Sequence, residues 1–154
     1  SSSEKMYADN ANMWFVQIPD IDEAKLYAIG AILNSTLFSV LARSIALPQD
    51  GGYFKFNKQF LEPVPFPKDR FLSNQELREQ ISNKAKEIEE RQEQYASSGT
   101  TSRNVIRGVL NQLWKELDDA VYTLYEVTDE ERTFFIERGR NVDRVDFLNQ
   151  WVYV

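Results

Sequence analysis

The chain has 154 residues, is 42% hydrophobic and 13% aromatic, and carries a formal net charge of -6 at pH 7. This apolar content is enough to bury one core, so disorder is not the default expectation. The sequence contains no cysteine and no histidine. Their absence excludes disulfides, thiolate metal sites, and both the commonest general base and the commonest metal ligand.

The charges are distributed unevenly along the sequence. Residues 25–70 hold six Lys and Arg against three acidic residues, whereas residues 71–154 hold eleven against sixteen. An acidic chain argues against nucleic-acid binding over its whole surface, but the middle segment is basic. Three net charges also fit an ordinary solvated surface, so this asymmetry supports a DNA contact only together with other features.

A strand and an apolar helix are predicted first. Residues 13–18 are aromatic and β-branched and end at Pro19, which predicts a strand. The following helix, over residues 21–45, is apolar on nearly every face and is therefore expected at the centre of the core. Polar residues interrupt the apolar stretch 26–47, which favours a buried helix over a membrane span.

A turn and a boundary follow this helix. Gly51 and Gly52 predict a loop, and the aromatic residues after them predict a short extended or turn-like segment. Three prolines between residues 63 and 67 then hold the chain extended, because each fixes its own φ and disfavours helix in the residue before it. We expect a boundary here.

Beyond the boundary the sequence predicts an antiparallel helical hairpin. Ser73 and Glu76 have the spacing of a capping box. Residues 96–102 are small and polar and predict a flexible loop, with the second helix starting near Asn104. Each helix has one narrow apolar stripe, and a hairpin would bury both while leaving Lys86 on its outer face. The stripes are Leu77, Ile81, Ala85 and Ile88, and then Ile106, Leu110, Leu113, Leu117, Val121 and Leu124.

A last short helix is predicted to start with the capping box of Thr128 and Glu131 and to end near Gly139. The predicted fold is thus α+β and helix-dominated, with a small sheet packed on a buried central helix, an antiparallel helical hairpin and a short C-terminal helix. The corresponding parts are residues 1–72, 73–127 and 128–154. The tail from residue 141 is assigned neither strand nor coil.

No catalytic motif accompanies these elements. Gly51 and Gly52 lack the Lys-Ser/Thr pair of a phosphate-binding loop, and no nucleophile elbow or acidic cluster with metal-ligand spacing is present. Asp118 and Asp119 point in different directions on a helix. We therefore expect no active site in this chain by itself.

The most informative stretch is residues 51–67, GGYFKFNKQFLEPVPFP, after residues 26–45, LYAIGAILNSTLFSVLARSI. Leu-Asn-Ser, Gly-Gly-aromatic, a basic residue between aromatics, Lys-Gln and Pro-x-Pro follow one another here. This order resembles the TaqI-like C-terminal specificity domain of bacterial adenine DNA methyltransferases and type IIG restriction enzymes. Residues 117–131, LDDAVYTLYEVTDEE, extend the resemblance, which spans residues 25–137.

The resemblance implies a C-terminal target-recognition fragment of a restriction-modification enzyme in the bacterial cytoplasm. Its implied partners are double-stranded DNA and the methyltransferase catalytic domain of the same chain or complex, with no membrane. The family's Asn-Pro-Pro-aromatic signature is absent. S-adenosylmethionine is therefore expected in an upstream catalytic domain and no cofactor in this fragment. Part of the base-reading surface is also expected upstream of Ser1.

The candidate DNA-binding residues are Arg43, Lys55, Asn57, Lys58 and Gln59. Lysines can bind phosphates, and Asn and Gln side chains can pair bidentately with adenine edges. On the opposite interpretation, the aromatic residues of this turn are core anchors, the glycines are turn residues and the polar side chains face water. Two further polar residues of the preceding helix, in its Leu-Asn-Ser motif, could face the same groove.

A protein-interaction module is the alternative function, in which the hairpin docks the specificity region onto the catalytic domain or a partner subunit. The acidic residues 74–154 favour this role, and the basic residues 25–70 favour DNA binding. Both can hold at once.

The first prediction is that the isolated chain neither methylates nor cleaves DNA, because it lacks histidine, cysteine and cofactor motifs. When the chain is incubated with a DNA duplex and labelled S-adenosylmethionine, we expect the duplex to take up no label above background. When it is incubated with a duplex and magnesium, we expect the duplex to stay uncut. Transfer above that of a heat-denatured sample would contradict this.

Overall fold

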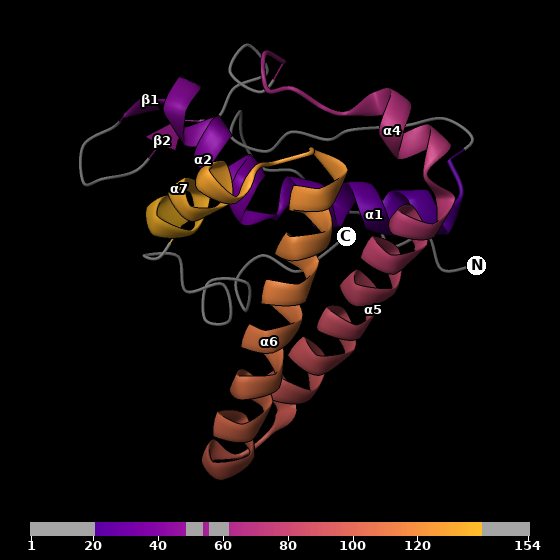
Figure 1. Cartoon of the computed structure of the whole chain (residues 1–154). Helices are drawn as coiled ribbons and strands as arrows, with labels where there is room; N and C mark the ends of the chain where they lie inside the picture. Colours follow the sequence, from indigo (N-terminus) through magenta and orange to yellow (C-terminus); the bar gives the residue numbers. More distant parts are fainter. Residues whose placement is uncertain (1–20, 49–53, 56–61, 140–154) are drawn as a thin grey trace.

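The computed structural model describes residues 21–48, 54–55 and 62–139. This part of the chain is all-α, and Figure 1 shows two long helices that extend side by side from a body of shorter ones. The six helices are α1 (Glu23–Leu33), α2 (Thr36–Ile45), α4 (Lys68–Ser73), α5 (Gln75–Ser97), α6 (Thr100–Leu124) and α7 (Asp129–Gly139). The segments β1 (Leu47–Pro48) and β2 (Phe54–Lys55) pair antiparallel over two residues each.

The predicted α+β fold, with a small sheet packed on a central helix, is wrong for the described residues. A two-residue pair is too short to form a layer, and the buried faces of α1 and α2 pack on helices instead. The predicted strand at residues 13–18 and the tail from residue 141 lie outside the described residues. The predicted C-terminal helix is confirmed by α7.

The helix predicted over residues 21–45 is in fact two helices that meet at an angle of 57°. Ser35 stands between them with an extended backbone, at φ -69° and ψ 158°. Its hydroxyl donates to the carbonyl of Ile32 at 2.7 Å and accepts from the N–H of Phe38 at 3.2 Å. It thereby satisfies one free group of each helix end. The break lets α1 pack on α5 while α2 packs on α6 and α7.

In the described part of the chain, no single helix is long and apolar enough to cross a membrane. Only the bent pair of α1 and α2 would be so by length and composition when taken together.

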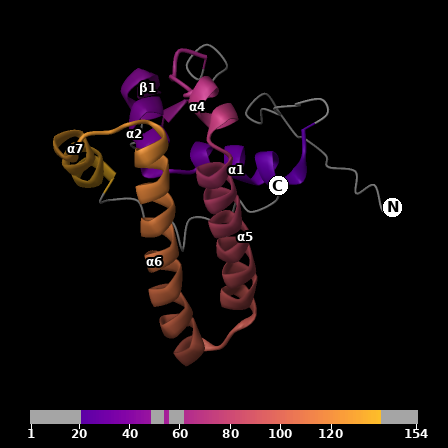
Figure 2. The same cartoon turned by 45° about the vertical axis from the view of Figure 1, so that its right-hand side comes forward.

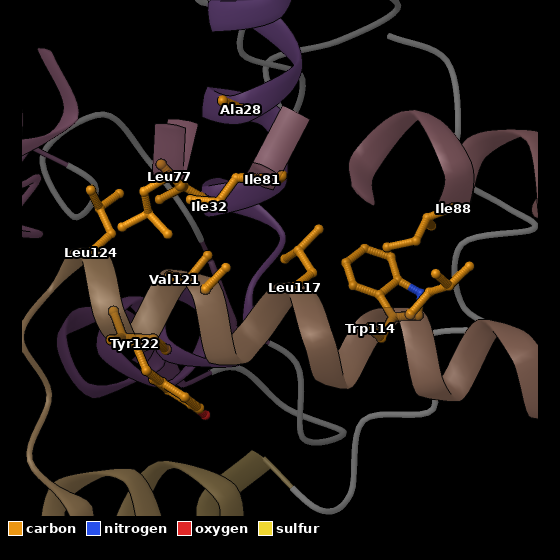
Figure 3. Packing of buried hydrophobic residues seen from close by; sticks show 14 of the residues in the cluster. Ala28, Ile32, Leu77, Ile81, Ile88, Trp114, Leu117, Val121, Tyr122 and Leu124 are labelled. Carbon is orange, nitrogen blue, oxygen red and sulfur yellow. The ribbon is translucent and has the colours of Figure 1, made fainter. Parts of the chain in front are cut away.

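The predicted hairpin is confirmed by α5 and α6, whose stripes face each other in Figure 3. Buried residues of the two stripes are Leu77, Ile81 and Ile88 in α5, and Leu110, Leu113, Leu117, Val121 and Leu124 in α6. Ala85 and Ile106 pack against this cluster from partly exposed positions. Ala28 and Ile32 of α1 extend the same core.

The loop of the hairpin is shorter than predicted, because only residues 98 and 99 separate the two helices. Arg103 donates to the carbonyls of Tyr95 at 3.1 Å and Ala96 at 3.0 Å. These carbonyls belong to the last turn of α5, where helical partners are missing. Arg103 therefore lets both helices continue into residues whose composition predicted a flexible loop.

A second face of α5 packs on α1, so the prediction that Lys86 lies on the outer face is wrong. Lys86 pairs with Glu23 at 3.2 Å and lies 4.9 Å from the centroid of the Tyr27 ring. The Tyr27 hydroxyl donates to Glu89 at 2.6 Å. This hydrogen bond, together with burial, raises the pKa of Tyr27 to about 12.

Two capping predictions had different outcomes. The box of Thr128 and Glu131 is confirmed: the Glu131 carboxylate accepts from the Thr128 N–H at 2.9 Å, and the Thr128 hydroxyl accepts from the Glu131 N–H at 3.3 Å. The box at Ser73 is wrong by one residue. Asn74 caps α5 through the N–H of Leu77 at 3.0 Å, because Ser73 is the last residue of the short helix α4, which the sequence did not predict.

The hairpin core generates a stability prediction. Leu117 is 0% exposed, so Leu117→Ala should lower the free energy of unfolding by about 2–5 kcal/mol. The control is Val105→Ala, because Val105 is 70% exposed on the same helix and alanine is the better helix former. Denaturant unfolding followed by circular dichroism measures both. Similar losses in the two variants would contradict the assigned faces.

Candidate nucleic-acid interface

Helix α2 is fixed to the hairpin at its N-terminus by one buried carboxylate. The backbone N–H of Thr36 donates to one oxygen of Asp118 at 2.9 Å, and the Thr36 hydroxyl donates to the other at 2.7 Å. Both residues are buried. A carboxylate at the positive end of a helix also complements the helix dipole. Asp118 thus joins α2 to α6.

Helix α7 packs beside α2, as Figure 2 shows. A Cβ atom added to Gly139 would overlap the Cγ2 atom of Thr36. The C-terminal end of α7 therefore approaches the same residue that binds Asp118. With one end held between α6 and α7, α2 directs its other end toward β1 and β2.

Arg43 lies in the last turn of α2 and is half-buried. The free carbonyls of this turn favour a cation, so the helix itself accounts for part of its placement. None of the ion pairs between described residues involves Arg43. Its guanidinium charge is therefore not neutralised by a described carboxylate.

The backbone of Lys55 lies beside the chain that leaves α2. In the antiparallel pair, Leu47 faces Lys55 and Pro48 faces Phe54. Leu47 follows the last residue of α2 by only two positions. Two of the five candidate DNA-binding residues, Arg43 and Lys55, are thus brought to the same end of α2.

The other three candidates, Asn57, Lys58 and Gln59, lie outside the described residues. The chain after them is anchored on α2 as well, because Val64 is buried against Phe38 and Ala42.

A second anchor follows at the base of the hairpin. The Tyr125 hydroxyl donates to the carbonyl of Pro65 at 3.0 Å, and burial raises the pKa of Tyr125 to about 12. Arg70 of α4 pairs with Glu126 and donates to the carbonyl of Leu124 at 3.2 Å. The chain from Pro65 to α4 is therefore tied to the C-terminal end of α6.

Asn34 and Ser35 do not lie at the end of α2 that carries Arg43. Ser35 is 0% exposed and caps α2, while the Asn34 amide donates to the carbonyl of Gly30 at 2.8 Å and closes α1. Helix α2 has ten residues and is about 15 Å long. Asn34 and Ser35 lie before its start, whereas Arg43 lies in its last turn. We conclude that the Leu-Asn-Ser motif has a structural role here.

Asp118 is the important residue that sequence analysis did not assign. Its neighbour Asp119 points in a different direction on the helix, which predicts no paired acid–base role for Asp118. One feature pointed to a different role, because Asp118 adjoins Leu117 on the stripe side of α6. A carboxylate placed next to a buried stripe needs a hydrogen-bonding partner.

Among the described side chains, no group of three or more Asp and Glu is arranged to hold a metal ion. Comparisons of the chain with models of protein families, with curated proteins and with solved structures gave no match.

The contact between Thr36 and Asp118, which we call the α2 joint, can be tested by a matched pair of variants at two neighbouring carboxylates. Asp118→Ala removes the acceptor of two buried donors of Thr36, so we expect a loss of about 1–3 kcal/mol or more of unfolding free energy. Asp119→Ala removes a partly exposed pair with Arg132, with an expected loss of about 0–1 kcal/mol. Thermal and denaturant unfolding measure the loss of unfolding free energy in each variant. An equal loss in both, or a larger loss in Asp119→Ala, would contradict the α2 joint.

Proposed function

We propose that this chain is the C-terminal DNA target-recognition fragment of a restriction-modification adenine methyltransferase and is non-catalytic by itself. We further propose that it contacts double-stranded DNA at the C-terminal end of α2 and at the adjoining segment β2. The observation that carries this proposal is that the backbone of Lys55 pairs with Leu47, two residues after the helix whose last turn contains Arg43. Lys55 and Arg43 both belong to the segments on which the family resemblance rests.

The local charges suit a phosphate contact. An arginine binds a phosphate bidentately and a lysine binds it as a point charge. Arg43 has no carboxylate partner among the described residues, so its binding to DNA would not first require breaking a described ion pair. Contacts of this kind position a protein on the duplex without reading bases.

Arg43 lies on a helix that is attached to two others. Its helix is bonded to Asp118 at one end and packs on both α6 and α7. Side chains on a fixed helix hold their geometry better than those on a loop, which suits a recognition element. In the parent enzyme, an upstream domain would bind S-adenosylmethionine and perform methyl transfer, and the enzyme would act in the bacterial cytoplasm.

A protein-interaction role is the second candidate, and the outer face of α1 favours it. Leu26 and Leu33 are 40% and 38% exposed, and a Cβ added to Gly30 between them would meet no atom within 4 Å. These residues form one apolar stripe on a helix whose other side is buried. The methyltransferase domain of the parent is the partner that this role implies.

The DNA contact predicts a change in salt dependence. Duplex binding by Arg43→Gln combined with Lys55→Gln should be weaker, and the slope of log K against log salt should fall by about 0.9 for each phosphate that the variant no longer neutralises. Fluorescence anisotropy with a labelled duplex at several salt concentrations measures both quantities.

The control for this experiment is Lys84→Gln combined with Arg138→Gln, which removes the same charge from α5 and α7. We expect its slope to stay that of the wild type. Equal slopes for all three proteins, each still folded by circular dichroism, would remove the end of α2 from the DNA interface.

A further inference from the structure

One side of the hairpin lies away from the other described helices. Lys84 of α5 pairs with Glu116 of α6 across this side. Residues three and four positions apart continue it along both helices, and we call this surface the side face. It consists of Gln80, Lys84, Glu87, Arg91 and Gln94 of α5, and of Thr101, Val105, Val109, Gln112 and Glu116 of α6.

The remaining helices pack on other sides of the hairpin. Lys86 and Glu89 of α5 contact α1, and Asp118 of α6 bonds to α2. At 3.6 residues per turn, these positions lie on the opposite half of each helix from the side face. Among the described residues, those of the side face form hydrogen bonds and ion pairs only within the hairpin. Figures 1 and 2 show the loop end of the hairpin pointing away from α1, α2 and α7.

The α6 half of the side face is uncharged and partly apolar over about three turns, from Thr101 to Gln112. Val105 is 70% exposed and Val109 is 39% exposed. Valine is a weak helix former, so helix stability does not explain two valines at exposed positions. A Cβ atom added to the neighbouring Gly108 would meet no atom within 4 Å, which leaves room for another backbone to approach.

The α5 half of the side face carries charges of alternating sign at Lys84, Glu87 and Arg91. Glu87 is 43% exposed in its side chain, and its ion pair with Lys84 is long, at 3.9 Å. Arg91 donates to the Gln94 side chain at 2.9 Å and takes part in none of the ion pairs between described residues. The face therefore presents one acid and one base, a helical turn apart, to another molecule.

This order of charges is complementary to itself. Two copies that meet face to face about a two-fold axis across the helices place α5 antiparallel to α5 and α6 antiparallel to α6. An axis midway between Glu87 and Arg91 brings Arg91 of each copy opposite Glu87 of the other. The same ion pair then forms twice, and no like charges of this pair face each other.

The same axis brings the apolar residues of α6 together. Lys84 pairs with Glu116. Nearer the loop, Arg103 donates to the carbonyl of Tyr95. These two contacts fix the relative heights of the helices, and the level midway between residues 87 and 91 falls near Val109. Val109 of one copy therefore meets Val109 of the other, beside the open backbone of residue 108.

We propose that the side face is a self-association surface, at which a second copy of this chain binds in an antiparallel arrangement. Binding here is independent of the proposed DNA contact, because α2 packs on the opposite half of α6. Two helices about 10 Å wide and about 22 Å long would bury roughly 900 Å² in total, which is less than stable complexes bury. We therefore expect a weak dimer, with a dissociation constant of about 10 μM or more.

The test uses two charge reversals that disable the face in opposite ways. Arg91→Glu leaves two acids on the face, and Glu87→Arg leaves two bases. Each variant alone should associate about tenfold more weakly than the wild type, because like charges then meet twice. An equimolar mixture of the two should associate at least as tightly as the wild type, because every acid then faces a base.

The control is Glu93→Arg, which makes the same change as Glu87→Arg at an exposed position on the opposite half of α5. Its self-association should match that of the wild type. Circular dichroism checks that all variants are folded. Sedimentation velocity at about 10 to 500 μM protein, which brackets the expected dissociation constant, measures association.

Three results would overturn the proposal. One is a wild-type chain that stays monomeric over the whole concentration range. Another is an equal loss of association in Glu93→Arg and Glu87→Arg. The third is a mixture of the folded Arg91→Glu and Glu87→Arg variants that associates no better than either alone, because reciprocal pairing of residues 87 and 91 requires the mixture to recover.

Discussion

The arrangement of the helices depends on one buried carboxylate. Asp118 accepts hydrogen bonds from both donors of Thr36, so α2 is bonded to the hairpin at its first residue. The opposite end of α2 points away from this contact. A buried carboxylate is costly unless it is hydrogen-bonded, and the free N–H groups at a helix start are the donors that it needs. The hydrogen bonds that satisfy the buried Asp118 carboxylate therefore also set the direction of α2. The position of Arg43 follows from that direction, because Arg43 lies two turns further along the same helix.

The base of the hairpin is closed by a second set of bonds. Helix α6 ends in a Schellman motif, in which the N–H of Val127 bonds to the carbonyl of Tyr122 at 3.0 Å and that of Glu126 to Thr123 at 3.2 Å. Glu126 has φ 56°, a conformation more often taken by glycine. Its carboxylate pairs with Arg70, so α4 stabilises this strained end of the helix. The chain after the proline-rich stretch is in this way tied to the hairpin and, through Asp118, to α2.

The sequence predicted the elements whose residues repeat regularly. The stripes from Leu77 to Ile88 and from Leu110 to Leu124 gave the hairpin, and Thr128 with Glu131 gave the start of α7. The α+β class was wrong for the described residues: it rested on a strand at residues 13–18, which lie outside them, and on an extended segment after Gly52, where the described residues contain only a two-residue pair. The break at Ser35 was not predicted, because the apolar residues before and after the polar run 34–36 fit one continuous helix. Partners distant in sequence, such as Asp118 for Thr36 and Glu23 for Lys86, leave no local pattern. Of the candidate site, the placement of Arg43 and of the Lys55 backbone is described, and the role of both residues in DNA binding stays a prediction.

The short turn at residues 98 and 99 has a consequence for the order of folding. Because α5 and α6 are neighbours in sequence, closing their loop costs little chain entropy, and most of their contacts need no other part of the chain. The bond between Thr36 and Asp118 instead joins residues 82 positions apart. We therefore expect the hairpin to be formed in the folding transition state and α2 to dock afterwards. Changes in the hairpin core would then slow folding, whereas changes at the α2 joint would mainly accelerate unfolding and shorten the lifetime of the native state.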